Sequence, residues 1–173
     1  MKLQGQVAVI TGAGSGIGRA SALAFAEEGA CVLAADLNAA SAAETVEQVR
    51  AAGAEAEPST VDVTNAGQVE AMVQRAVDRF GRIDVLFNNA GLPQAFTPFE
   101  DSTDALYDRI MDVNVRGVFY GCRAAIPRMK AQGGGVILNT ASTAGIRPRP
   151  GLAVYNASKA AVICLTKTLA VMP

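Results

Sequence analysis

Tyr155 and Lys159 stand four positions apart in the stretch "YNASK", and together they could move a proton. Residues four apart on a helix lie on the same face, so a lysine ammonium can sit beside the phenol. A free tyrosine titrates near ~10, and a neighbouring positive charge favours the phenolate. Tyr155 could therefore be a general acid or base with Lys159 as its electrostatic activator. The alternative is an ordinary pair of helix surface residues.

The chain contains no histidine, which removes other routes to proton transfer. A Ser-His-Asp triad, a Cys-His dyad and a histidine base are excluded within one chain. The cysteines Cys31, Cys122 and Cys164 show no CxxC spacing, so without histidine we expect no metal site. All three lie in apolar segments, where we expect buried thiols, and reduced thiols fit a cytoplasmic location.

A glycine-rich stretch, "TGAGSGIG" at 11–18, separates an apolar run from a helical pattern. Glycines permit a tight turn and let backbone N–H groups approach a phosphate, while the helix N-terminus adds partial positive charge. The spacing from Gly12 through Gly16 to Gly18 is G-x-x-x-G-x-G, which differs from the usual G-x-G-x-x-G. The stretch has no Walker lysine, so nucleoside triphosphate hydrolysis is not expected. A flexible strand-to-helix connection is the alternative.

Asp36 closes the second apolar run, 18 residues after Gly18. An acid at this point can accept hydrogen bonds from both hydroxyls of an adenosine ribose, and it repels a 2′-phosphate. Neither Ser15 nor Leu37 supplies a cation for such a phosphate. The sequence therefore favours NAD over NADP. The alternative role for Asp36 is a helix N-cap, although Asn38 could fill that position.

Apolar runs and helical spacing alternate along the chain. The runs predict strands at 6–12, 31–36, 56–63, 83–91 and 135–142. The three-to-four spacing predicts helices at 16–30, 38–53, 65–81, 102–135 and 155–172, with a Gly/Pro loop at 143–154. Pro127 could bend the fourth helix near its C-terminal end.

This alternation predicts an α/β fold with a doubly wound, Rossmann-like parallel sheet covered by helices on both faces. Ligands of such sheets bind outside the carboxyl ends of the strands. The turn at 12–18, Asp36, Asp62, the 88–91 segment and Ser142 all fall at predicted strand ends, so we expect them to share one site. We expect residues 1–173 to form a single dinucleotide-binding domain.

The bulk composition limits the partners. The net charge of −1 gives no general attraction to nucleic acid or anionic lipid, and the basic pair Arg147 and Arg149 reads as part of a loop. The N-terminal apolar run lacks the features of a signal peptide, and no stretch approaches the ~18 apolar residues of a membrane span. We expect a small-molecule substrate, with no nucleic acid and no membrane.

The motifs together resemble the classical short-chain dehydrogenase/reductase family, from about residue 6 to residue 170. The matching pieces, in chain order, are "TGAGSGIG", Asp36, Asp62-Val63, "NNAG" at 88–91, Asn114 in "MDVNV", Ser142 in "NTAS", and "YNASK". The resemblance implies an oxidoreductase that moves a hydride between a secondary alcohol or ketone and NAD.

The resemblance also implies roles for individual residues. Ser142, Tyr155 and Lys159 would be catalytic with Asn114 as a fourth member, which would position a water that relays protons. Asp62 and Val63 would hold the adenine. Helices 102–132 and 155–172 would form the faces of a possible homo-oligomer. The implied cofactor-binding set is Thr11, Gly12, Ser15, Gly16, Ile17, Gly18, Asp36, Leu37, Asp62, Val63, Asn89, Ala90, Gly91, Tyr155 and Lys159.

The chain departs from the family pattern after Ala170. The family continues with a sixth strand, a Pro-Gly turn at the nicotinamide, a substrate lid and a seventh strand, whereas this sequence ends in Met172-Pro173. We therefore expect a fold that is incomplete at the C-terminus, an exposed edge at the strand 135–142, and low or absent activity of the isolated chain. The alternative function is a non-catalytic NAD-binding or interaction fragment. Weaker alternatives are an epimerase of sugar nucleotides and an NADPH-dependent reductase of acyl-carrier-protein thioesters.

Overall fold

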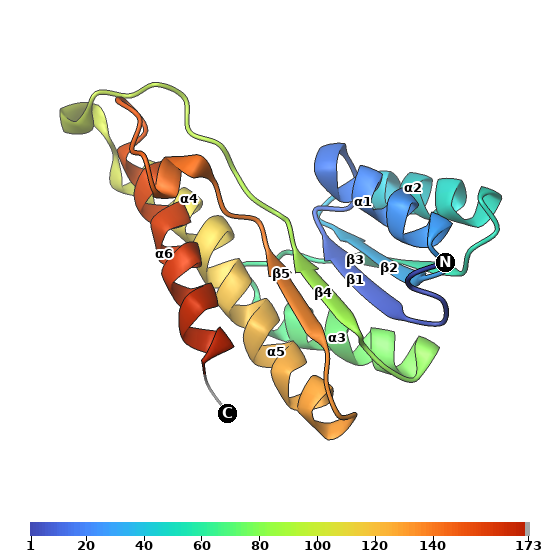
Figure 1. Cartoon of the computed structure of the whole chain (residues 1–173). Coiled ribbons are helices and arrows are strands. Elements are labelled where there is room, and N and C mark those ends of the chain that lie inside the picture. Colours follow the sequence, from blue (N-terminus) through green and yellow to red (C-terminus); the bar gives the residue numbers. More distant parts are fainter. Residues whose placement is uncertain (172–173) are drawn as a thin grey trace.

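The computed structural model of the chain describes residues 1–171, and its centre is a five-stranded parallel sheet (Figure 1). The strand order is β3-β2-β1-β4-β5. The chain therefore builds outward from β1 in one direction, then returns to build β4 and β5 on the other side. The predicted doubly wound α/β sheet is confirmed. The strands are β1 (Val7–Thr11), β2 (Cys31–Asp36), β3 (Ala56–Thr60), β4 (Val85–Asn88) and β5 (Val136–Asn139).

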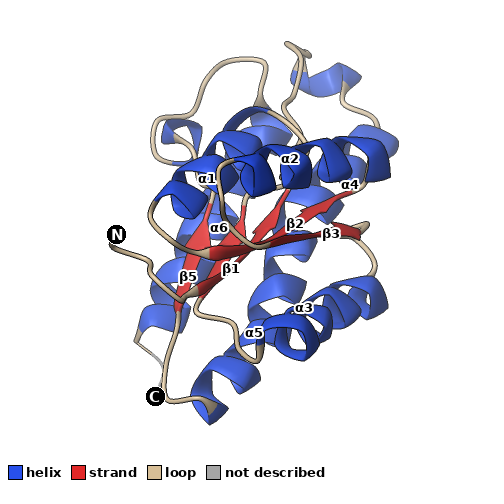
Figure 2. Cartoon of the chain, turned by 90° about the vertical axis from the view of Figure 1, so that its right-hand side faces the viewer, coloured by secondary structure: helices blue, strands red, loops and turns tan. Residues whose placement is uncertain are grey.

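Helices cover both faces of the sheet (Figures 1 and 2). Helices α1 (Gly16–Glu27) and α2 (Ala39–Ala51) lie on one face, and α3 (Ala66–Phe80) and α5 (Gly117–Ala131) lie on the other. Strand β1 shows how this works, because Val9 packs toward α3 and α5 while the next residue, Ile10, packs toward α1 and α2. Both side chains are fully buried, as expected for a central parallel strand.

The helix starts show which amides are already paired. Asn38 caps α2 by accepting the Ser41 N–H at 3.1 Å, and Asn65 caps α3 in the same way from Gln68. The N-cap of α2 is therefore Asn38, and the alternative role of Asp36 as the N-cap of that helix is wrong. In contrast, Ser15 stands at the start of α1 and makes no side-chain cap bond. The first amides of α1 are left for another partner.

The predicted helix at 102–135 is not one regular helix. It consists of α4 (Asp104–Met111), a π-helical turn η2 (Asp112–Arg116) and α5, after a short 3₁₀ turn η1 (Phe99–Asp101). A π turn inserts an extra residue into a helix, and such turns are often found at functional sites. This one contains Asn114.

Near the end of the chain, a 3₁₀ turn η3 (Thr143–Gly145) lies within the predicted Gly/Pro loop. The last helix, α6, runs over Ala153–Ala170, so it begins two residues before its predicted start. Its predicted end at Met172, like Pro173, lies outside the described residues.

Strand β5 pairs with β4 and forms one edge of the sheet, as predicted. Its side chains Val136 and Leu138 are 54% and 40% exposed. They lie in register beside Val85 and Phe87 of β4, which are more buried, so the exposed apolar strip consists of Val136 and Leu138. Within the described chain, none of the helices has both the length and the apolar character needed to cross a bilayer.

The three cysteines are free thiols with different surroundings. Cys122 is buried, Cys31 is half-buried and Cys164 is exposed. The prediction of three buried thiols is therefore confirmed for Cys122, only partly met for Cys31 and wrong for Cys164. The inward side chains of α6 include Val154, Ser158 and Val162, and Cys164 lies off that stripe although its neighbours are apolar.

Candidate functional site

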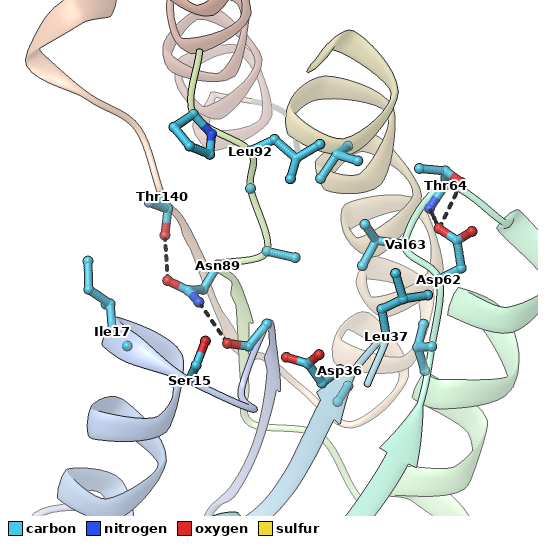
Figure 3. A pocket seen from close by; sticks show the side chains of 18 of the residues that line it. Ser15, Ile17, Asp36, Leu37, Asp62, Val63, Thr64, Asn89, Leu92 and Thr140 are labelled. Carbon is cyan, nitrogen blue, oxygen red and sulfur yellow. Dashed lines mark hydrogen bonds between the residues drawn. The ribbon is translucent and has the colours of Figure 1, made fainter. Parts of the chain in front are cut away.

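A cavity of about 660 Å³ opens at the carboxyl ends of the strands. All five strand ends contribute, since Gly12, Asp36, Asp62, Asn89 and Thr140 each follow or close a different strand. Figure 3 shows the first turn of the fold on one side of this cavity and the residues after β2 and β3 on the other. The cavity thus lies where the strand order reverses, which is where doubly wound sheets bind ligands.

The turn after β1 is shaped by glycines. Gly12 has a positive φ of 64°, and a Cβ there would lie 2.9 Å from Cα of Ala90. A Cβ at Gly18 would overlap the carbonyl of Gly12, so helix α1 begins directly against the turn. Gly16 also has a positive φ, but the space around its missing Cβ is open. The turn therefore leaves a free approach to the uncapped start of α1, as a bound phosphate would require.

Two side chains that the sequence reasoning missed hold the back of this turn. Thr45 of α2 donates to the Ala13 carbonyl at 2.9 Å, and Arg19 donates to the Gly14 carbonyl. Arg19 also forms an ion pair with Glu44 at 2.8 Å. The turn carbonyls are therefore occupied on the side of α2. Thr45 lies on a helix distant in sequence, so the glycine motif gave no signal for it, whereas Arg19 directly follows the motif.

Asp36 is held at the end of β2 with its carboxylate in the cavity (Figure 3). One oxygen accepts the Gly14 N–H at 2.8 Å, and the other accepts the Asn38 N–H at 2.9 Å. Each carboxylate oxygen can accept a second hydrogen bond, so both remain available to a ligand. A Cβ at Gly14 would lie 2.8 Å from this carboxylate, which explains why the position needs glycine.

Asn89 connects three strand ends (Figure 3). Its amide nitrogen donates to the Thr11 carbonyl at 3.1 Å, and its amide oxygen accepts from the Thr140 hydroxyl at 3.3 Å. The Asn89 backbone N–H donates to the Thr11 hydroxyl at 3.0 Å. This side chain therefore fixes the ends of β1, β4 and β5 relative to one another, and the cavity wall with them.

Tyr155 and Lys159, one turn apart on α6, both line the cavity. The Lys159 side chain is buried, and its Nζ lies 5.8 Å from the centre of the Tyr155 ring. Nζ donates to the Thr140 carbonyl at 2.7 Å. Burial lowers the pKa of Lys159, because the ammonium loses water. The structure thus places a desolvated cation beside the phenol, as the four-residue spacing predicts.

Asn114 is fully buried in the π turn. Its oxygen accepts the Leu92 N–H at 2.7 Å, and its nitrogen donates to the Leu92 carbonyl at 3.0 Å and to the Ser158 hydroxyl at 3.1 Å. The side chain therefore joins the segment after β4 to helix α6. The water relay implied for Asn114 stays a prediction, and its side chain is already engaged with protein partners.

Ser142 is half-buried and caps η3 by accepting the Ala144 N–H at 3.1 Å. Of the predicted site residues in the described chain, Ser142, Asn114, Thr11 and Gly18 do not line the cavity, whereas the other thirteen do. Among the lining residues that were not predicted are Thr64, Leu92, Pro93, Arg109, Val113 and Thr140.

Some of these missed residues had a sequence signal. Thr140 precedes Ser142 by two positions and Val113 adjoins Asn114, so proximity to the motifs could have found them. Arg109 had no such signal. No group of three or more potential His, Cys, Asp or Glu metal ligands occurs in residues 1–171.

The strand order and the cavity define a nucleotide-binding protein of the doubly wound class. Comparison with protein families then identifies the chain more closely. The sequence model described as short chain dehydrogenase matches residues 6–172, and the chain belongs to this family. The predicted family is confirmed.

Individual relatives agree with this assignment. The chain is 44% identical to 3beta-hydroxysteroid dehydrogenase 2 of Eggerthella lenta, over 98% of this chain and 66% of that protein. A solved structure of NAD⁺-bound xylitol dehydrogenase matches with a TM-score of 0.96 at 41% identity, over 98% of this chain and 65% of that one. A 3-ketoacyl-(acyl-carrier-protein) reductase from Brucella melitensis, complexed with NADH, matches with a TM-score of 0.92 at 43% identity, over 98% and 70%. The chain thus spans about two thirds of the length of these relatives.

Proposed function

We propose that this protein is an NAD-dependent oxidoreductase that transfers a hydride between nicotinamide and a secondary alcohol or ketone. One observation carries the proposal: the Tyr155–Lys159 pair lines the same cavity as Asp36 and the uncapped start of α1. A site that binds a dinucleotide and a site that can move a proton therefore share one wall. The solved relatives that contain NAD⁺ and NADH support the choice of cofactor.

Different residues of the cavity suit the pyrophosphate, the adenosine ribose and the adenine of a dinucleotide. The amides at the start of α1 would bind the pyrophosphate, since they are uncapped and carry the positive end of the helix dipole. Asp36 would accept hydrogen bonds from the adenosine ribose hydroxyls and exclude a 2′-phosphate. Val63 follows Asp62 in the wall and would contact the adenine. The bound NAD supplies the hydride acceptor or donor for the substrate carbon.

The proton of the alcohol would move to Tyr155. The Lys159 ammonium would favour the phenolate form, because opposite charges attract. Ser142 would donate a hydrogen bond to the substrate oxygen as charge develops there. During ketone reduction, the same phenol would return the proton. This pair does the work for which many enzymes use histidine, which the chain lacks.

Three predictions about the whole protein stay part of this proposal: a single domain over 1–173, a cytoplasmic location, and a homo-oligomer through helices 102–132 and 155–172. The half-exposed rings of Tyr107 and Phe119 support the last of these. They line a hollow together with Leu165 of α6, so both predicted helices contribute to one surface, which also carries Asp108, Asp112 and Arg116.

The second candidate function is a non-catalytic NAD-binding or interaction fragment. Its support is that Ser142 lies outside the cavity lining and that the apolar side chains of β5 are exposed. A third candidate function, the reduction of acyl-carrier-protein thioesters, gains support, because a solved structure of such a reductase contains NADH. The predicted preference for NAD therefore does not discriminate against it.

The test is NADH formation by the purified chain with a panel of secondary alcohols. Tyr155→Phe removes the hydroxyl and should reduce turnover by about 10²-fold or more, the usual contribution of a general base. Tyr107→Phe keeps the ring on the proposed oligomer surface and removes only a hydroxyl outside the cavity lining, so it should leave turnover unchanged. If the unmodified chain and both variants bind NAD without turnover, the non-catalytic fragment is favoured. Turnover that survives in Tyr155→Phe would contradict the proposal.

A further inference from the structure

Gln94 belongs to no motif, yet it touches the backbone of Tyr155. It lies in the segment between β4 and η1, and its side chain is buried with 8% of the residue exposed. Its amide oxygen accepts the Tyr155 N–H at 2.9 Å. Its amide nitrogen donates to the Gly151 carbonyl at 3.4 Å. Gln94 is thus bonded to both sides of the start of α6.

The need for this contact follows from how helices begin. The first amides of a helix have no partner within the helix, and the side chain at the cap position usually binds one of the second or third residue. Helix α6 has Leu152 at its cap position, which has no polar side-chain atom. Tyr155 is the third residue of the helix. Gln94 supplies, from 61 positions away, the acceptor that a cap residue would normally supply.

The segment that carries Gln94 is itself fixed at both ends. On the cavity side, both backbone groups of Leu92 are bonded to Asn114. On the other side, the Thr97 N–H donates to the Gly151 carbonyl at 3.0 Å, and the Phe96 ring packs so closely on Gly151 that a Cβ would overlap it. Gln94 therefore reaches α6 from a segment that is bonded on both sides and that also contacts the predicted site residue Asn114.

We propose that Gln94 is a positioning residue, which caps α6 in place of Leu152 and thereby holds Tyr155 beside Lys159 in the cavity. Its importance for catalysis rests on the function proposed above. The phenol can exchange a proton with a substrate only if its helix turn is fixed, because misplaced acid–base groups lose much of their effect.

Two variants of similar shape test this role. Gln94→Met keeps the length of the side chain and loses the acceptor, whereas Gln94→Glu keeps an acceptor for the Tyr155 N–H. In ¹⁵N-labelled chain, we expect Gln94→Met to speed hydrogen exchange of the Tyr155 amide by about tenfold or more, as for a lost buried hydrogen bond. The amide of Val162, two turns further along α6, should change by less than twofold.

The same samples report the position of the ring. We expect the nuclear Overhauser contact between the Tyr155 ring and the Lys159 side chain to weaken in Gln94→Met and to persist in Gln94→Glu. If Gln94→Met leaves the Tyr155 amide and this contact unchanged, or loosens all of α6 equally, the proposal is wrong. Neither measurement needs turnover, so the proposal about Gln94 can fail or succeed independently of the Tyr155→Phe assay.

Discussion

Lys159 is a buried cation, although an ammonium group prefers water. An ammonium group is buried beside a phenol, and its hydrogen bond in the structure goes to the Thr140 carbonyl. Burial without a neighbouring acid explains why the pKa of Lys159 is lowered. Burying a cation costs stability. A cation at this position is nevertheless expected if the site has to favour a phenolate.

This lowered pKa predicts a pH dependence of stability. Between the lowered pKa of the folded state and the ordinary lysine value, the unfolded chain binds more protons at this position than the folded chain. The free energy of unfolding should therefore rise with pH in that alkaline window, relative to Lys159→Met, which has no charge to lose. Urea unfolding at several pH values measures this. The titration of Cys31 and Cys122 is common to both proteins and cancels in the difference, so parallel pH profiles would contradict the prediction.

Asp36 should decide which dinucleotide binds. If Asp36 accepts hydrogen bonds from the ribose as proposed, Asp36→Ala should weaken NAD binding by about 10- to 100-fold. It also removes the repulsion of a 2′-phosphate, so NADP should lose much less affinity. Titration with NADH and NADPH, followed by their fluorescence, measures both. Glu47→Ala is the matched control, because it removes an exposed acid of α2 that does not line the cavity. Equal losses for both dinucleotides would count against this role.

At the scale of residues, the sequence predicted the places of the side chains that belong to its motifs. The positions of Asp36, Tyr155 and Lys159 on the cavity wall followed from strand ends and helical spacing. Thr45 and Gln94 could not be predicted, because each binds backbone groups of an element that is distant in sequence. A local sequence pattern does not indicate which distant backbone groups will lie beside a side chain in the fold.

At the scale of elements, close contact between α5 and the sheet depends on Gly121. A Cβ at this position would overlap the side-chain amide of Asn88, which is buried and donates to Asn139 at 2.8 Å. Gly121→Ala should therefore destabilise the fold by about 1–3 kcal/mol, the usual cost of overpacking.

Gly67→Ala is the control for this substitution. In α3 the nearest atom to the new Cβ would be Oδ1 of Asn65 at 3.4 Å, an ordinary contact. There the better helix propensity of alanine should stabilise the fold by up to about 1 kcal/mol. Urea unfolding of both variants measures the two signs. Similar effects at both positions would show that propensity rather than packing governs Gly121.

The π turn shows where element prediction fails. The spacing at 102–135 is helical throughout, so a single helix was the reasonable prediction. The observed interruption coincides with two tertiary contacts: Asn114 bonds the backbone of Leu92, and Gly117 packs against Val63. Both involve segments distant in sequence. The type of element was therefore readable from the sequence, whereas its interruption depended on the assembled fold.

At the scale of the whole molecule, alternating strands and helices made the fold the most predictable feature. Strand β5 is one edge of the described sheet. Unpaired strand edges with apolar side chains promote association. Leu138→Lys places a charge on this strip and should reduce the concentration-dependent association of the chain, as measured by light scattering. Ile146→Lys makes the same change at a loop residue that is 72% exposed. If both variants behave like the unmodified chain, association does not occur through β5.

The proposed function requires that NAD binds in the cavity at the carboxyl ends of the strands. The measurement that tests it is a titration of the ¹⁵N-labelled chain with NAD, followed by the shifts of assigned backbone amides. We predict saturable shifts at Gly16, Leu37, Val63 and Gly91, with little change in the outer turns of α3. Shifts confined to other surfaces, or none at millimolar NAD, would contradict both the binding site and the function built on it.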